Sequence, residues 1–175
     1  FMAVVALLVK LQDGGPIVFS QVRVGQNGRT FRLHKFRSMV VDAEAKKAEL
    51  EHLNERQGPT FKLSYDPRVT RVGRFIRRTS PDELPQLFHV PRGEMSLVGP
   101  RPPLPTEVNT YDPWHRRRLS MKPGITGLWQ ISARDQPGFD TWVALDLEYI
   151  DNWSPLGDLA ILARTIPAVL KLSGK

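Results

Sequence analysis

The chain has 175 residues, enough for one domain with a hydrophobic core. With 41% hydrophobic and 25% charged residues, it does not have the composition of a disordered protein. The absence of cysteine excludes a disulfide scaffold, a thiolate zinc site and a cysteine nucleophile. The net charge of +7 favours an anionic partner, and leaves nucleic acid, anionic lipid and a phosphorylated substrate open.

An apolar segment begins the sequence. Residues Phe1–Val9 are all apolar, and the Gly-Gly-Pro at 14–16 ends the helix that they predict. At about 1.5 Å per helical residue, this helix is too short to cross a hydrocarbon core of roughly 30 Å. It also lacks the basic start of a signal peptide. We interpret Phe1–Leu11 as the remainder of a longer apolar helix, with an ordinary core helix as the alternative.

The next segment predicts a β-hairpin. Two runs rich in β-forming residues, Ile17–Val24 and Thr30–Phe36, flank the sequence Gly-Gln-Asn-Gly at 25–28. The Asn-Gly step favours a tight reversal between antiparallel strands.

Three helices are expected in the middle of the chain. Asp42–Arg56 is rich in Ala, Glu, Lys and Leu, which predicts an exposed helix. Arg68–Arg78 predicts a short amphipathic helix, with arginines on one face and aliphatic residues on another. A helix of about two turns begins near Asp82 and ends before Pro91.

The remaining segments indicate an α+β fold that is mainly helical. Residues 94–105 predict a short strand and then a proline-braced loop, and Asp112–Ser120 predicts a turn of basic helix. Residues 121–134 read as a loop punctuated by Gly and Pro. Helices are expected over Phe139–Asn152 and Leu156–Leu170. Strands and helices do not alternate regularly, so a doubly wound sheet is not expected.

Two adjacent carboxylates, Asp82 and Glu83, stand between prolines in RRTSPDELPQL. They could form a helix start, with Ser80 as N-cap, Pro81 as the first helical residue and Glu83 as the capping-box partner. They could instead form a reaction centre. One carboxylate would attack phosphorus to give an acyl phosphate, and the other would hold Mg²⁺. Local spacing leaves both interpretations open.

Several cations could offset the charge of a phosphorylated substrate near this pair. Arg101 lies between prolines in GPRPP, and a rigid backbone suits bidentate binding of phosphate; an arginine that seals a turn is the alternative. Lys35 lies near the end of the second predicted strand, where a solvated strand face is the alternative. Arg77 and Arg78 stand shortly before the carboxylates in the sequence.

Taken together, these segments resemble the catalytic domain of the bacterial sugar transferases, the monotopic phosphoglycosyl transferases that act on polyprenyl phosphate. The matching stretches are GPIVFSQVRVGQNGRTFRLHKFRSM, RVTRVGRFIRRTSPDELPQLFHVPRGEMSLVGPRP and KPGITGLWQISAR. They occur in the order of the family and cover about half of the chain.

The resemblance implies a reaction and a set of site residues. A sugar 1-phosphate passes from a UDP-sugar to undecaprenyl phosphate and UMP is released, by a ping-pong route through a phosphosugar on aspartate. The position of that nucleophile is Asp82, and Glu83 matches the glutamate that helps to hold Mg²⁺. Residues for phosphate or nucleotide binding are implied at Lys35, Arg77, Arg101 and Pro102.

The resemblance also implies an arrangement at a bilayer. Residues 1–11 correspond to the returning half of a re-entrant membrane helix, whose entry half and Ser-Pro bend are absent from this sequence. Residues 12–175 correspond to a single catalytic domain. The expected location is the cytoplasmic face of the bacterial inner membrane, and homodimers occur in the family. The expected donor carries glucose or galactose, in the first step of exopolysaccharide, capsule or O-antigen assembly.

Two other functions remain as alternatives. A basic nucleic-acid-binding module would explain the charge, but no recognised nucleic-acid motif is present and aromatic residues do not interleave with the basic run. We therefore expect no nucleic-acid partner. An inactive scaffold of the same fold would not require the carboxylate pair, Arg77 and Arg101, all of which are present.

Overall fold

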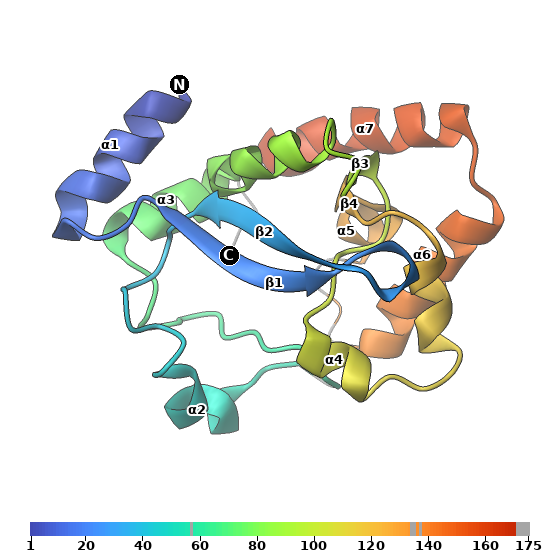
Figure 1. The fold of residues 1–175 in the computed structure, drawn as a ribbon, viewed down its shortest axis with the longest axis horizontal. Coiled ribbons are helices and arrows are strands. Elements are labelled where there is room, and N and C mark those ends of the chain that lie inside the picture. Colours follow the sequence, from blue (N-terminus) through green and yellow to red (C-terminus); the bar gives the residue numbers. More distant parts are fainter. Residues whose placement is uncertain (57, 134–135, 137, 171–175) are drawn as a thin grey trace.

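The computed structural model describes residues 1–56, 58–133, 136 and 138–170, and within them the fold is the expected mainly helical α+β type (Figure 1). Here η denotes a 3₁₀ helix. In chain order the elements are α1 (Met2–Asp13), β1 (Val18–Val24), η1 (Gln26–Gly28), β2 (Thr30–Phe36), α2 (Lys47–Leu50), η2 (Glu51–Leu53), α3 (Arg71–Thr79), η3 (Pro81–His89), β3 (Ser96–Val98), α4 (Pro105–Asn109), η4 (His115–Ser120), β4 (Gly124–Thr126), α5 (Leu128–Ser132), α6 (Phe139–Asp151) and α7 (Pro155–Leu170).

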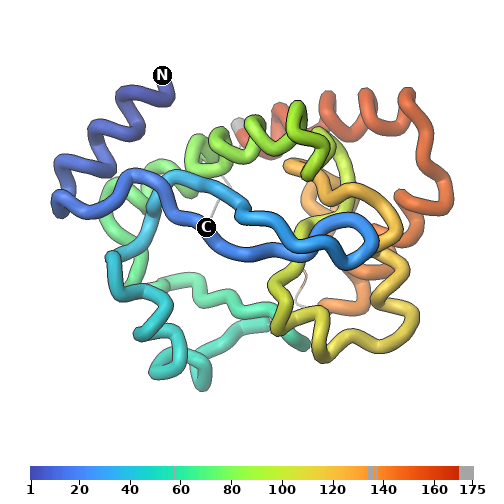
Figure 2. Tube along the Cα trace, in the orientation of Figure 1, coloured from blue at the N-terminus to red at the C-terminus, as the bar shows by residue number. Residues whose placement is uncertain are grey.

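The predicted hairpin is confirmed. Strands β1 and β2 are antiparallel, with Val18 opposite Phe36 and Val24 opposite Thr30. The reversal places Asn27 and Gly28 at φ 55° and 78°, the left-handed region that Asn and Gly tolerate. The trace in Figure 2 shows this hairpin crossing the middle of the molecule, with α1 at one end and α6 at the other.

The outer edge of β2 is covered by η3. The backbone N–H of His34 donates to Nε2 of His89 over 3.2 Å, and Nδ1 of the same ring lies 2.6 Å from the Glu94 carboxylate. With Nδ1 donating and Nε2 accepting, both ring nitrogens have partners, and His89 is fully buried. An edge strand with unpaired backbone groups is in this way joined to a helix.

Helix α3 packs against the residues that follow β2. It is capped by Thr70, whose hydroxyl accepts from the N–H of Gly73 over 2.9 Å. The N–H of Thr70 donates to the Ser38 carbonyl over 3.1 Å. As predicted, Ile76 is buried while Arg71, Arg74 and Arg78 are exposed. The helix begins three residues later than expected, because Arg68 is buried in an ion pair with Asp66 before it.

The predicted exposed helix over Asp42–Arg56 is wrong. Only Lys47–Leu50 are α-helical, and Glu51–Leu53 continue as a single 3₁₀ turn. Neither short element buries a residue. Helix propensity alone is a weak determinant, and here no apolar face docks on the core to extend the helix.

The expectation of a loop over residues 121–134 is also wrong for residues 121–133, the described part of the segment. Arg134 lies outside the described residues. Gly124–Thr126 form β4, which pairs in parallel with the predicted strand β3, and Leu128–Ser132 form α5. The two backbone segments approach closely because each has a glycine at the contact. A Cβ on Gly124 would lie 2.0 Å from the backbone N of Gly99. The proline-braced loop after β3 leads into the short helix α4, which begins at Pro105.

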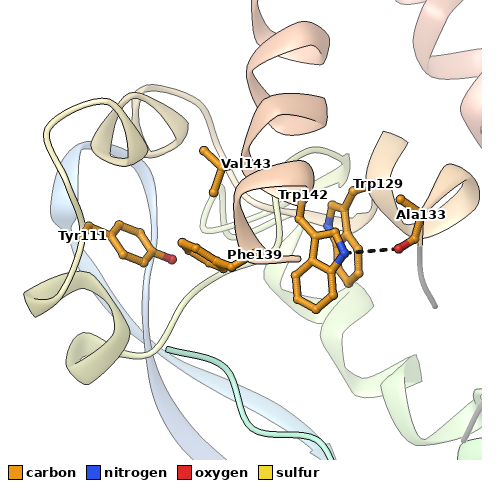
Figure 3. Packing of buried hydrophobic residues seen from close by; sticks show 6 residues of the cluster. All are labelled: Tyr111, Trp129, Ala133, Phe139, Trp142 and Val143. Carbon is orange, nitrogen blue, oxygen red and sulfur yellow. Dashed lines mark hydrogen bonds between the residues drawn. The ribbon is translucent and has the colours of Figure 1, made fainter. Parts of the chain in front are cut away.

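Among the described residues, the core has three clusters of buried apolar residues. The first joins α5 and α6: Trp129 and Trp142 stack at 4.8 Å, and the Trp142 indole N–H donates to the Ala133 carbonyl over 3.2 Å (Figure 3). The second cluster joins α1, β2 and α3, and its buried members are Val5, Val9, Phe36 and Ile76. The third joins β3, α6 and α7, and its buried members are Val98, Tyr149 and Ile161.

The apolar N-terminal segment is a helix that ends, as predicted, at Gly14 in the left-handed conformation. Val5 and Val9 pack on the domain, whereas Phe1, Leu7 and Leu11 are exposed. Among the described residues, no helix is both long enough and apolar enough to span a membrane. The re-entrant arrangement of residues 1–11 stays a prediction.

The contact between α3 and the Ser38 backbone leads to a stability prediction. A Cβ on Gly73 would lie 1.8 Å from the Ser38 carbonyl oxygen, so Gly73→Ala must push α3 away from the hairpin. We expect the free energy of unfolding to fall by about 1–3 kcal/mol, the range for overpacking. Urea denaturation followed by circular dichroism measures the change.

Gly157→Ala in α7 is the matched control. Its Cβ would meet only the Ser154 hydroxyl, which accepts the Gly157 N–H and would need to shift by a few tenths of an ångström. Alanine also favours a helix over glycine by about 1 kcal/mol. Equal stability of the two variants would contradict the proposed close approach at Gly73.

Candidate active site

One cavity of about 610 Å³ brings together all six residues predicted from the sequence. They come from β2, the end of α3, the start of η3 and the loop after β3: Lys35, Arg77, Asp82, Glu83, Arg101 and Pro102. Residues of β4, α5 and α7 form another part of the wall, including Thr126, Trp129 and Val169. Segments far apart in the sequence therefore meet at one hollow.

The carboxylate pair lies in the first turn of η3. Ser80, at φ 62°, reverses the chain between α3 and η3, and Pro81 is the first helical residue. The Ser80 hydroxyl makes no capping bond, so the capping-box interpretation with Glu83 is wrong. The helix start is real, but a left-handed Ser80 does not direct its side chain at the helix. Asp82 is buried and Glu83 half-buried, and both line the cavity.

Burial dominates the chemistry of Asp82. Removal from water and the neighbouring Glu83 charge raise the pKa of its carboxyl to about 7, against the opposing effect of Lys35 and Arg77. The desolvation of the anion thus outweighs the attraction of the cations in the ligand-free protein. The carboxyl group remains poised to ionise near neutral pH.

Lys35 and Arg77 face the same carboxyl from two elements. Burial, together with the charges of Arg77 and Arg23, lowers the pKa of Lys35 to about 8. Burial also lowers the pKa of Arg77, whose Nε donates to the Ser38 hydroxyl over 2.8 Å. The Ser38 hydroxyl thus orients Arg77, and the Ser38 backbone carbonyl accepts the N–H of Thr70, the N-cap residue of α3.

Arg101 is held by a buried carboxylate on α4. Its guanidinium donates to Glu107 over 3.1 Å, and the same carboxylate accepts the N–H of Leu104 over 2.9 Å. Glu107 is 3% exposed and Arg101 is 29% exposed, so the cation reaches the cavity from a buried anchor. The prediction that this loop presents Arg101 rigidly is supported by these contacts.

Sequence reasoning missed two residues of this site. Arg23 lines the cavity on β1, and Glu107 anchors Arg101 from behind. The period of two in a strand could have indicated Arg23, because its side chain lies on the same hairpin face as Lys35. No sequence signal marks Glu107, since the ion pair depends on how the proline-rich loop folds.

The donor set fits a magnesium ion. Mg²⁺ prefers oxygen ligands and is usually held by one or two carboxylates together with water and substrate phosphates. Asp82 and Glu83 supply adjacent carboxylates in an open cavity with room for a phosphorylated ligand. Among the described residues, no group of three or more His, Cys, Asp or Glu side chains could hold a metal alone.

Comparison with known proteins identifies the family. The model of the bacterial sugar transferase family matches residues 1–172. The chain belongs to this family. The match includes α1 and the complete cavity wall described above. The resemblance inferred from the short segments is therefore confirmed.

Three relatives illustrate the similarity to other bacterial sugar transferases. The chain is 54% identical to galactosyl transferase CpsE of Streptococcus agalactiae, over 93% of this chain and 36% of the relative. It is 48% identical to the exopolysaccharide production protein ExoY of Sinorhizobium fredii, over 93% of this chain and 74% of the relative. It is 46% identical to the undecaprenyl-phosphate galactose phosphotransferase of Salmonella typhimurium, over 93% of this chain and 35% of the relative. The chain thus spans about a third of the length of two of these three transferases.

The raised pKa of Asp82 predicts the stability of Asp82→Asn. Between an ordinary carboxyl pKa of 3.8 and about 7, the folded state keeps a proton that the unfolded state loses. The wild type therefore loses stability as the pH rises through this window, by at most about 4 kcal/mol at about 1.4 kcal/mol per pKa unit. Asparagine removes this dependence, so the variant becomes the more stable protein above pH 7.

This prediction is measured by urea denaturation of both proteins with EDTA from pH 4 to pH 8. The quantity of interest is the difference in unfolding free energy, which cancels the titration of groups that do not interact with Asp82. A difference that stays constant over this range would show that the folded state does not raise the pKa of Asp82. Glu148→Gln, at an exposed site with no ion pair among the described residues, is the control and should show no trend.

Proposed function

We propose that this chain transfers a hexose 1-phosphate from a UDP-hexose to undecaprenyl phosphate and releases UMP. The observation that carries this proposal is a buried carboxylate, Asp82, in a cavity whose cations come from three other elements: Lys35, Arg77 and Arg101. A carboxylate that faces several cations suits attack on a phosphorus atom that carries negative oxygens.

The first half-reaction forms a bond between an Asp82 carboxylate oxygen and the sugar-linked phosphorus of the donor. The bond from that phosphorus to the bridging oxygen breaks, and the electron pair leaves with UMP. Lys35, Arg77 and Arg101 bind the diphosphate oxygens, where charge develops as the leaving group departs. The product is a sugar phosphate joined to Asp82 as an acyl phosphate.

The second half-reaction regenerates the carboxylate. A phosphate oxygen of undecaprenyl phosphate attacks the same phosphorus, and the bond to Asp82 breaks. The product is an undecaprenyl diphosphate sugar, and the enzyme returns to its starting state. UMP leaves before the acceptor reacts, so one set of cations can serve both phosphate groups in turn.

Mg²⁺ bound to Glu83 and to diphosphate oxygens would neutralise negative charge at the donor. Glu83 suits this role because it is half-buried at the cavity wall and its charge lies beside Asp82. Cations at this position also favour the ionised form of Asp82, which is the form that attacks.

Galactose is the first donor sugar to test. Three relatives are named for galactose, and the one from Erwinia amylovora is named UDP-galactose-lipid carrier transferase. A relative from Aeromonas hydrophila, 39% identical, is named for N-acetylgalactosamine. The relatives from two rhizobial species are named for exopolysaccharide production, which supports a place at the start of polysaccharide assembly.

We also propose that the cavity opens at the cytoplasmic surface of the bacterial inner membrane. Its acceptor is an insoluble lipid whose phosphate lies at headgroup level. Phe1 of α1 and Val169 of α7 both line the cavity, and these helices expose further apolar side chains, including Leu7, Leu11 and Ile166. Phe75 is exposed on the basic face of α3. An apolar surface bordered by arginines suits an anionic bilayer.

The transfer reaction is tested by UMP release in lipid nanodiscs with undecaprenyl phosphate, Mg²⁺ and a panel of UDP-sugars. We expect release with UDP-galactose and a loss of at least 1000-fold in Asp82→Asn, because an amide does not form the acyl phosphate. Asp112→Asn, whose side chain is exposed, should retain wild-type activity.

A covalent route also predicts that the protein itself becomes labelled during the reaction. Donor radiolabelled in the sugar should label the wild-type protein when acceptor is omitted, and should not label Asp82→Asn. UMP release that survives this substitution would exclude Asp82 as the nucleophile. If none of the UDP-sugars in the panel yields UMP, the proposed donor class is contradicted.

The membrane proposal is tested by binding to phosphatidylglycerol vesicles. We expect Leu7→Ser together with Leu11→Ser to lower the partition coefficient at least about tenfold, since burying each leucine contributes about 1.5–3 kcal/mol. Tyr65→Ser is the control, because Tyr65 is 91% exposed on a loop outside these helices. Unchanged binding of the double variant would exclude this face of α1 from the bilayer contact.

A further inference from the structure

Arg23 occupies the cavity wall from the first strand of the hairpin. In the β1–β2 register, Phe19 is opposite Lys35 and Arg23 is opposite Phe31, so Arg23 and Lys35 lie on one face. Both side chains line the cavity that contains Asp82. Arg23 is 8% exposed, which makes it one of four buried arginines among the described residues.

The other three buried arginines are neutralised by carboxylates, and Arg23 is not. The three ion pairs are Arg37 with Asp13, Arg68 with Asp66, and Arg118 with Asp146. Within the described residues, Arg23 has no carboxylate within 4.0 Å. Buried cations are rare unless they are paired, so Arg23 departs from the pattern that the rest of this molecule follows.

The contacts of Arg23 leave donor capacity unused. One terminal nitrogen donates to the Pro102 carbonyl over 3.1 Å, and the other to the Gln21 side-chain amide oxygen over 2.7 Å. Both acceptors are uncharged. The Nε–H is buried and has no partner among the described residues. Burial and the nearby charge of Arg101 lower the pKa of Arg23 to about 10, although the charges of Glu107, Glu44 and Glu83 act in the opposite direction.

We propose that Arg23 is an anion-binding residue of this cavity and donates to phosphate oxygens of the bound ligand. A phosphate would supply the negative charge and the acceptor that the guanidinium lacks, in a site that excludes much of the water. The identity of the ligand rests on the proposed function. The phosphate oxygens belong either to the diphosphate of a UDP-sugar or to the headgroup of undecaprenyl phosphate.

A purely structural role is the competing explanation. Arg23 holds the carbonyl of Pro102, the residue next to Arg101, and could serve only to fix that loop. Such a role would not require a position on the cavity wall. It also makes a different prediction, because a fixing residue affects folding stability without a specific effect on phosphate binding.

The test measures binding of inorganic pyrophosphate and of UDP by isothermal titration calorimetry, in parallel with the thermal unfolding midpoint. We expect Arg23→Gln to raise the dissociation constant for pyrophosphate about 10–100-fold, the effect of losing a charge-assisted contact in a buried site. Arg32→Gln is the matched control. It removes the same charge from the opposite face of the hairpin, where Arg32 is exposed, and should leave binding within about twofold.

Three results would overturn the inference: wild-type protein that does not bind pyrophosphate, unchanged affinity in Arg23→Gln, or equal weakening in Arg32→Gln. If Arg23→Gln does not fold, Arg23→Lys decides the question, since it keeps the charge but loses the guanidinium fork. We then expect about 3–10-fold weaker pyrophosphate binding, and unchanged affinity would overturn the inference.

Two further measurements distinguish the source of the phosphate and separate this inference from the proposed function. Weaker UDP binding in Arg23→Gln assigns the contact to the donor diphosphate. Unchanged UDP binding with a higher KM for undecaprenyl phosphate assigns it to the lipid. If pyrophosphate binding depends on Arg23 but no UDP-sugar yields UMP, the proposed function fails while the inference about Arg23 stands.

Discussion

The docking of η3 on β2 through the His89 ring is the contact on which the site depends. This ring accepts the N–H of His34 at one nitrogen and reaches Glu94 at the other, and it stacks on the His34 ring at 5.2 Å. A fully buried imidazole is tolerable because both nitrogens have partners. Since Asp82 lies at the beginning of η3 and Lys35 lies on β2, fixing the end of η3 to the strand also fixes the carboxylate near the lysine.

The same packing sets an electrostatic conflict. It buries a carboxylate and several cations around a cavity, and burial opposes the charged form of each. Burial raises the pKa of Asp82 and lowers that of Lys35, although each is attracted by the other. Desolvation is therefore the larger effect for both groups. A bound diphosphate would compensate the cations, and a Mg²⁺ ion held by Glu83 would favour the ionised carboxylate.

Sequence patterns predicted the elements that are determined by neighbouring residues in the chain. The Asn-Gly reversal and two β-rich runs specify the hairpin, and alternating arginines and aliphatic residues specify the faces of α3. The helix over Asp42–Arg56 failed because propensity was not accompanied by burial. Strand β4 was missed because three residues carry little pattern, and its pairing depends on close approach between Gly99 and Gly124. The left-handed Ser80 was missed because it depends on how α3 and η3 meet.

The site was predictable only as a set, and the structure explains why. Each cation has an ordinary local alternative: Lys35 on a strand face, Arg77 at a helix end, Arg101 in a turn. Arg77 is oriented by Ser38 and Arg101 by Glu107, two residues on different segments of the chain. No single segment therefore determines the chemistry. Arg23 escaped notice for the same reason, because its lack of a carboxylate becomes visible only when all the buried arginines of the fold are compared.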